Sequence, residues 1–173
     1  MSIFRPPDHL VIYETDHWIV NHRVDSALPG YLMVGSKVET NVLAELTETA
    51  LSELGIHLSR LQQILTKLFA PPHFYIGRYG HMSGHSIHFH VIPVYEWVVQ
   101  AFLQDERYRI FRESSTSGHD NDNNAEFDGA EMTLFIWREF CEGGSSPRIV
   151  GPSVQETIGM IKRKMVGQGM GEL

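Results

Sequence analysis

Four of the chain's ten histidines lie within ten residues, at positions 81, 85, 88 and 90. The last two stand in an alternating segment, Ser86-Ile-His88-Phe-His90-Val. Successive side chains of a β-strand point to opposite faces, so a strand here would bury the apolar residues and display Ser86, His88 and His90 together. Two imidazoles on one face can ligate a metal ion, bind an anion or attack an electrophilic centre.

A loop with several small residues precedes this segment and contains Gly77, Gly80, Ser83 and Gly84. Backbone N–H groups in such a loop can hold a phosphate, and glycine lets the ligand approach closely. Three interpretations therefore compete. The histidines are solvated on a half-exposed strand, or they are two ligands of a metal site that needs a third. In the third, one imidazole attacks phosphorus while its neighbour holds the phosphate oxygens or transfers protons.

The segment from Ser86 to Pro93 resembles the motif of the histidine-triad (HIT) family, in which three histidines alternate with apolar residues and two apolar residues follow. His88 matches the middle histidine and His90 the last, whereas Ser86 replaces the first. The resemblance covers roughly residues 8–95, and we take residues 1–95 as the HIT-like core domain. It implies an α+β fold, with an antiparallel five-stranded sheet and a long helix packed on it.

The resemblance also implies a nucleotide hydrolase or nucleotidyl transferase. Such an enzyme cleaves at the α-phosphate of a dinucleoside polyphosphate or a nucleoside phosphoramidate through a covalent nucleotidyl-histidine intermediate. His88 would be the nucleophile, and His90 would hold a non-bridging oxygen together with Ser83 and Gly84. Since Ser86 cannot protonate a leaving group as an imidazole can, His81 and His85 are candidates to replace it. The predicted catalytic residues are therefore His88, His90 and Ser86.

Further substrate contacts are expected from the N-terminal half. The family's ribose-binding acid falls on Arg23, which would favour an extra phosphate or another anionic group. Val24 matches the residue that packs on the base, and Tyr75 falls where many members place a polar amide. Two alternatives remain: a metal-dependent enzyme that uses His88 and His90 as ligands, and a nucleotide-binding module with weakened catalysis.

The favoured interpretation requires no cofactor and no metal, and it makes a nucleotide the expected partner. A net charge of −7 argues against general attraction to nucleic acid. No apolar stretch is long enough to span a membrane. The single cysteine, Cys141, and the lack of an apolar leader predict a cytoplasmic protein. A homodimer is expected because family members commonly pair as symmetric dimers.

The elements that must position these residues can be read from the apolar pattern. Short apolar runs predict strands at 10–13, 18–21, 31–34, 73–78 and 85–92. Pro93 is expected to end regular pairing or to lie at an edge. Leucines at intervals of three and four residues predict an amphipathic helix over 47–69, with Thr47 as its N-cap.

Residues 96–173 lie beyond the resemblance and are expected to form a C-terminal extension packed on the same domain. The pattern predicts a helix over 97–111, a mobile polar loop at about 113–129 and a strand over 132–137. A capping box, Ser153 to Glu156, predicts a last helix. This extension is a candidate to cover the site, to set substrate choice or to mediate dimerisation.

Overall fold

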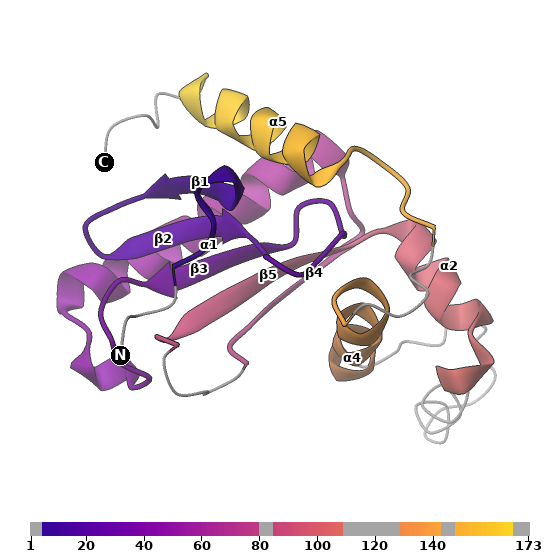
Figure 1. Ribbon diagram of the computed structural model, residues 1–173, viewed down its shortest axis with the longest axis horizontal. Helices are drawn as coiled ribbons and strands as arrows, with labels where there is room; N and C mark the ends of the chain where they lie inside the picture. The colour runs from indigo at the N-terminus through magenta and orange to yellow at the C-terminus, as the bar shows by residue number, and fades with distance from the viewer. Residues whose placement is uncertain (1–4, 80–84, 109–128, 143–147, 168–173) are drawn as a thin grey trace.

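The computed structural model describes residues 5–79, 85–108, 129–142 and 148–167. Five strands form one antiparallel sheet in the order β1-β2-β3-β5-β4. Helices cover both faces of this sheet (Figure 1). The strands are β1 (Val11–Glu14), β2 (Trp18–His22), β3 (Leu32–Ser36), β4 (His73–Gly77) and β5 (His88–Val94). The helices are α1 (Glu48–Phe69), α2 (Glu96–Gln104), α4 (Gly129–Phe140) and α5 (Val154–Val166), with 3-10 turns at Asp8–Leu10, Leu43–Glu45 and Glu106–Tyr108.

The predicted α+β fold is confirmed, and the strongest local signals define its elements. The hydroxyl of Thr47 accepts a hydrogen bond from the backbone N–H of Ala50, which caps α1 as the sequence predicts. Both bonds of the capping box at the start of α5 are formed between Ser153 and Glu156. After Ala70, two prolines separate α1 from β4.

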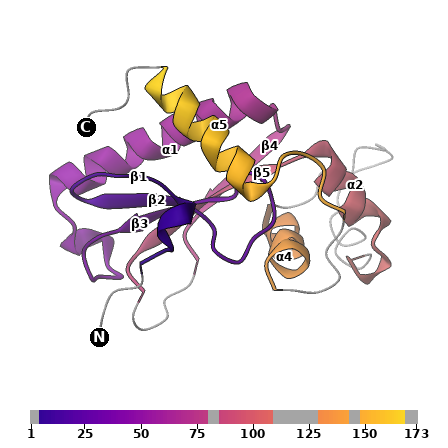
Figure 2. The ribbon, with the colours of Figure 1, turned by 45° about the horizontal axis from the view of Figure 1, so that its top comes forward.

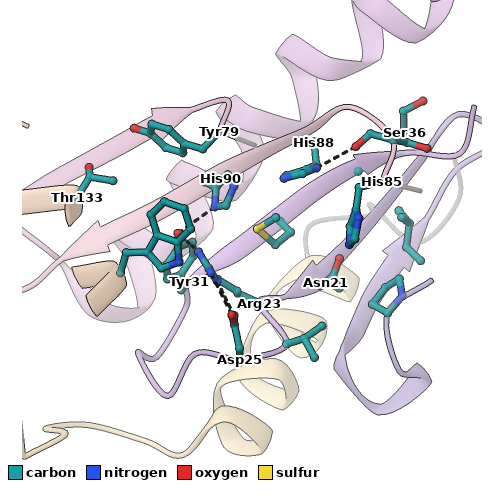
Figure 3. Close-up of a pocket in the computed structure, with 17 residues that line it drawn as sticks. Asn21, Arg23, Asp25, Tyr31, Ser36, Tyr79, His85, His88, His90 and Thr133 are labelled. Atoms are coloured by element: carbon teal, nitrogen blue, oxygen red, sulfur yellow. Dashed lines mark hydrogen bonds and ion pairs between the residues drawn. The ribbon is translucent and has the colours of Figure 1, made fainter. Parts of the chain in front are cut away.

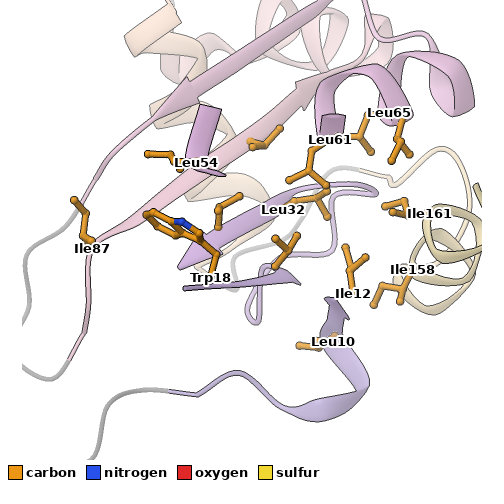
Figure 4. Packing of buried hydrophobic residues seen from close by; sticks show 14 of the residues in the cluster. Leu10, Ile12, Trp18, Leu32, Leu54, Leu61, Leu65, Ile87, Ile158 and Ile161 are labelled. Atoms are coloured by element: carbon orange, nitrogen blue, oxygen red, sulfur yellow. The ribbon is translucent and has the colours of Figure 1, made fainter. Parts of the chain in front are cut away.

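One face of the sheet packs under α1 and α5. Alternate residues of the strands point to this face, and they meet the leucine stripe of α1 in a buried cluster (Figure 4). Ile158 and Ile161 bring α5 into the same cluster, and Figure 2 shows α5 lying across α1 on that side. The members labelled in Figure 4 are Leu10, Ile12, Trp18, Leu32, Leu54, Leu61, Leu65, Ile87, Ile158 and Ile161.

The opposite face is only partly covered. Ile92 and Val94, at the end of β5, pack with α2 and α4 in a second buried cluster that includes Phe102 and Phe135. The first half of the same strand face carries His88 and His90 instead. The C-terminal extension therefore closes one end of this face and leaves the histidine end to form a cavity.

The prediction of a strand over 132–137 is wrong, because this segment lies in α4. In α4 the buried residues Met132, Phe135, Ile136 and Phe140 follow helical spacing. In a run of six mostly apolar residues, the two-residue period of a strand cannot be distinguished from the 3.6-residue period of a helix. Tertiary packing therefore decides which secondary structure forms. The extension thus contributes helices and no strand in its described part, and the predicted loop at 113–129 lies outside the described residues except at Gly129, which begins α4.

Three further boundaries differ from expectation. The histidine strand begins at His88, so residues 85–87 precede β5 instead of belonging to it. Pairing with β3 ends at Val91, as Pro93 predicts, but pairing with β4 continues through Pro93 to Val94. The helix predicted over 97–111 is α2 followed by a 3-10 turn, and the last residues of the predicted range are outside the described part.

None of the described helices is long and apolar enough to cross a membrane.

Candidate active site

A cavity of about 450 Å³ lies on the open end of the sheet face. Residues of β2, β3 and β5 form its floor, and Thr133 of α4 lies at one side (Figure 3). Trp137 of α4 also lines the cavity. The volume lies within the range of small-molecule sites in proteins. The remaining lining residues are Pro6, Ile19, Asn21, Arg23, Val24, Asp25, Tyr31, Met33, Gly35, Ser36, Tyr79, His85, Ser86, His88 and His90.

The two histidines of β5 share the cavity face, as the alternation predicts. Phe89 and Val91 point into the core under α1, whereas the rings of His88 and His90 lie 5.3 Å apart on the cavity side. Their different surroundings give them different properties. His88 is half-buried, whereas His90 is only 6% exposed.

The ring of His88 is oriented by the backbone. Its Nδ1 atom lies 2.9 Å from the carbonyl oxygen of Ser86. A carbonyl oxygen can only accept, so Nδ1 carries the proton and donates it. In the neutral ring the lone pair is then on Nε2, which is the nitrogen available to act as a nucleophile.

His90 is held by a side chain. Its Nδ1 atom lies 2.9 Å from the hydroxyl of Tyr31, and its Nε2 atom is buried without a hydrogen-bond partner among the described residues. Burial, followed by the charge of Arg23 and the neighbouring His88, lowers the pKa of His90 to about 3, against a smaller opposite effect of Asp25. The ring is therefore neutral at physiological pH.

Ser86 and His85 both line the cavity, although adjacent residues of a strand would point to opposite faces. Strand alternation does not apply to His85, because β5 begins only at His88. The backbone here is held by hydrogen bonds from Asn41 to the carbonyl of His85 and from the N–H of Ile87 to Thr40. The hydroxyl of Ser86 is buried without a hydrogen-bond partner among the described residues.

Arg23 and Val24 also line the cavity, from the segment that follows β2. Val24 is 45% exposed, which leaves its side chain open to a ligand. The side chain of Arg23 is only 11% exposed and forms an ion pair of 2.5 Å with Asp25. Its guanidinium also donates to the hydroxyl of Tyr31 at 2.8 Å and lies over the rings of Tyr31 and Trp137.

The structure does not bring every predicted residue to this site. Tyr75 of β4 pairs with Ile92, and its ring lies against Gly129 at the start of α4, outside the cavity lining. His81, Ser83 and Gly84 lie outside the described residues. Their expected contacts with phosphate therefore stay predictions.

Several lining residues were missed by sequence reasoning. Asn21 interrupts an otherwise apolar strand run, which was an available signal. Asp25 and Tyr31 flank a Pro-Gly loop with no pattern that marks them as functional. Trp137 was missed because its segment was assigned to a strand.

The metal alternative requires at least a third ligand beside His88 and His90. Within the part of the chain that the structure describes, no group of three or more histidine, cysteine, aspartate or glutamate side chains is placed to hold an ion. The described residues therefore supply no third ligand beside His88 and His90.

Solved structures with the same fold come from the histidine-triad family. A diadenosine triphosphate hydrolase from Plasmodium falciparum, in complex with cyclomarin A, matches 96% of this chain and 83% of its own, with a TM-score of 0.55 and 12% identity. A Zn-bound histidine triad family protein from Mycobacterium smegmatis matches 94% of this chain and 88% of its own, with a TM-score of 0.53 and 11% identity.

The C. elegans NitFhit protein matches 56% of this chain at 22% identity and a TM-score of 0.49, and the match spans 24% of that longer protein. No protein-family model matches the sequence, and no curated protein matches it significantly. The chain thus shares the fold of the histidine-triad proteins.

Proposed function

We propose that the protein cleaves a nucleoside phosphate ester or phosphoramidate at the α-phosphorus through a covalent intermediate on His88. The observation that carries this proposal is the hydrogen bond from Nδ1 of His88 to the carbonyl of Ser86. In the neutral form of the ring this bond leaves the lone pair on Nε2, and His88 lines a cavity of suitable size. The activity named for the P. falciparum neighbour is consistent with a dinucleoside polyphosphate as substrate.

The reaction would proceed in two displacements. The Nε2 lone pair of His88 attacks the α-phosphorus, an N–P bond forms, and the bond from phosphorus to the leaving group breaks. The leaving group departs with the bonding electron pair. Water then attacks the same phosphorus and loses a proton, the N–P electron pair returns to the imidazole, and a nucleoside monophosphate is released. A covalent nucleophile thus divides one difficult displacement into two easier ones.

Charge that develops on the phosphoryl oxygens needs donors in the cavity. We assign this role to Nε2 of His90, since the ring lies 5.3 Å from that of His88 in the cavity lining and Nε2 lacks a hydrogen-bond partner among the described residues. The backbone around Ser83 and Gly84 is proposed to contribute further donors, as the family resemblance implies.

Protonation of the leaving group distinguishes this chain from the family pattern. Ser86 occupies the position of the first histidine, and its hydroxyl is a weak acid compared with an imidazolium. A polyphosphate leaving group needs little protonation, whereas an amine does. We therefore favour dinucleoside polyphosphates over phosphoramidates, with His85 as the imidazole that the structure brings to the same cavity.

Mass spectrometry tests the covalent step directly. The full-length protein would be incubated with diadenosine tetraphosphate, quenched rapidly and digested. We expect an adenylyl adduct on the peptide that contains His88, and we expect the adduct to be absent in His88→Asn. His73→Asn is the matched control, because this exposed histidine on the edge strand β4 lies outside the cavity.

The weakened-module alternative, which Ser86 and Arg23 favour as departures from the family motif, predicts a different result. Such a protein would bind the nucleotide, as measured by calorimetry, and would form no adduct and no product. Turnover by His88→Asn at the wild-type rate would overturn the covalent mechanism. Turnover lost on chelation and restored by an added metal ion would instead favour the metal-dependent enzyme.

A further inference from the structure

A chain of hydrogen bonds connects the segment after β2 to the second histidine of β5. It runs from Asp25 through Arg23 and Tyr31 to Nδ1 of His90 (Figure 3). We propose that this chain selects the Nε2-protonated tautomer of His90, and that Arg23 is a positioning residue acting through Tyr31 and not a receptor for a substrate anion. The tautomer stands on the contacts alone, and only its catalytic consequence rests on the proposed function.

The direction of the chain follows from which groups can donate. A guanidinium has no acceptor, so the 2.8 Å contact from Nη1 of Arg23 to the hydroxyl of Tyr31 makes the tyrosine oxygen an acceptor. The hydroxyl proton then needs an acceptor of its own, since Tyr31 is only 2% exposed. Among the described contacts that acceptor is Nδ1 of His90, at 2.9 Å.

The proton of a neutral His90 must consequently be on Nε2. This atom is buried without a hydrogen-bond partner among the described residues, and His90 lines the cavity. A buried N–H without an acceptor is unfavourable, and an anionic phosphoryl oxygen would supply that acceptor. With the other tautomer, an Nε2 lone pair would instead repel the same oxygen. The selected tautomer thus makes His90 a donor.

The contacts of Arg23 within the protein occupy most of the hydrogen-bonding capacity of its guanidinium. Its Nε and Nη2 atoms donate to the carboxylate of Asp25 at 2.5 and 3.1 Å, which also neutralises its charge. The guanidinium carbon lies 5.1 Å from the ring centre of Tyr31 and 5.5 Å from that of Trp137, so aromatic rings flank it. An arginine held in this way orients its neighbours better than it recruits an anion.

The groups around His90 keep its ring neutral, so the tautomer and not the charge is what remains to be selected. Burial opposes a proton on His90 most strongly, Arg23 and His88 add to this effect, and Asp25 opposes it. Tyr31 and Tyr79 complete the surroundings, with the ring of Tyr79 at 5.2 Å edge-on to that of His90. Tyr79 contacts His90 through its ring, whereas Tyr31 forms a hydrogen bond with Nδ1 of His90 through its hydroxyl. Tyr31 is therefore the residue that selects the tautomer.

Nitrogen NMR on the full-length protein, labelled with ¹⁵N-histidine, tests the tautomer without any substrate. Long-range ¹H–¹⁵N correlations distinguish a protonated ring nitrogen from an unprotonated one, and His90→Gln assigns the signal. In the wild type we expect Nε2 protonated and Nδ1 unprotonated. In Tyr31→Phe and Arg23→Met we expect nitrogen shifts averaged over both tautomers.

Arg107→Met is the matched control. Arg107 also pairs with an aspartate two residues away, at 2.5 Å, and lies over a tyrosine ring at 5.7 Å, but it is outside the cavity lining. We expect it to leave the His90 signals unchanged. Protonation of Nδ1 in the wild type would overturn the proposal. Unchanged His90 signals in folded Arg23→Met would overturn the role of Arg23.

Kinetics on two substrates separate positioning from anion recognition. Because only the tautomer population changes, Arg23→Met should lower kcat/KM by roughly two- to tenfold, and equally for diadenosine triphosphate and tetraphosphate. An anion receptor would instead give a loss that grows with the number of phosphates. If the expected tautomer is found but no adduct forms on His88, the proposed function fails and this inference stands. If an adduct forms on His88 but His90 has the opposite tautomer, this inference fails and the proposed function stands.

Discussion

Nδ1 of His88 lies 2.9 Å from the carbonyl oxygen of Ser86, so the backbone of Ser86 orients the ring of the proposed nucleophile. Its side chain adds a buried hydroxyl that lacks a hydrogen-bond partner among the described residues. Backbone and side chain at position 86 can therefore be separated by mutation. A substitution at position 86 keeps the backbone carbonyl and changes only the side chain that could donate a proton to the leaving group.

Ser86→His should raise the rate with a nucleoside phosphoramidate by about tenfold or more, since general acids contribute in this range when the leaving group is a poor one. The rate with diadenosine tetraphosphate should change much less, because polyphosphate departs without help. Steady-state kinetics with both substrates measure this selectivity, and Ser86→His combined with His88→Asn should be inactive. An equal effect on the two substrates would contradict a role in leaving-group protonation.

The depressed pKa of His90 predicts a stability change with pH. The unfolded chain binds a proton near pH 6.5 and the folded chain only near 3, so His90 contributes stability above pH 6.5 that is lost as the pH falls between these values. The slope for one such group is about 1.4 kcal/mol per pH unit. Urea unfolding at several pH values should show a shallower dependence for His90→Gln than for the wild type.

Burial also lowers the pKa values of His22 and His57, and both contribute to the slope in the same direction. They remain in His90→Gln, so the difference between the two proteins isolates His90. Parallel curves for the two proteins would show that His90 titrates in the folded state much as it does in the unfolded chain.

Gly30 makes the turn that leads into Tyr31. Its φ of 75° suits glycine, and a Cβ atom at this position would lie 2.8 Å from Cδ2 of Leu65. Gly30→Ala should destabilise the fold by about 1–3 kcal/mol. Gly55→Ala is the control, since a Cβ there meets nothing within 4 Å on an exposed face of α1. That change should stabilise the protein by up to about 1 kcal/mol, as denaturant unfolding would show.

Trp137 brings the C-terminal extension to the cavity, and its side chain is 40% exposed there. If substrate occupies the cavity, Trp137→Ala should raise KM by roughly three- to tenfold, as expected for loss of one aromatic contact. Val166→Ala, an exposed apolar residue at the end of α5, should leave KM unchanged. Identical KM values for wild type and Trp137→Ala would place the substrate away from α4.

Local patterns were sufficient for much of the fold. The leucine stripe and Thr47 define α1, and the alternation around His88 and His90 assigns both rings to the same face. These features depend on backbone periodicity and on capping within a few residues, so one sequence determines them. The α4 segment shows the limit, because six mostly apolar residues fit either period and only packing against α2 selects the helix.

The sequence by itself determined which strand carries the histidines and which face of the sheet they share. The tertiary structure alone decided that Tyr31, 59 residues before His90, reaches its ring, and that Trp137 closes over Arg23. Such contacts join segments far apart in the chain, and their donors and acceptors become paired only when folding excludes water. A local sequence pattern cannot predict this pairing, because the pairing is caused by the burial of the two partners together in the folded protein.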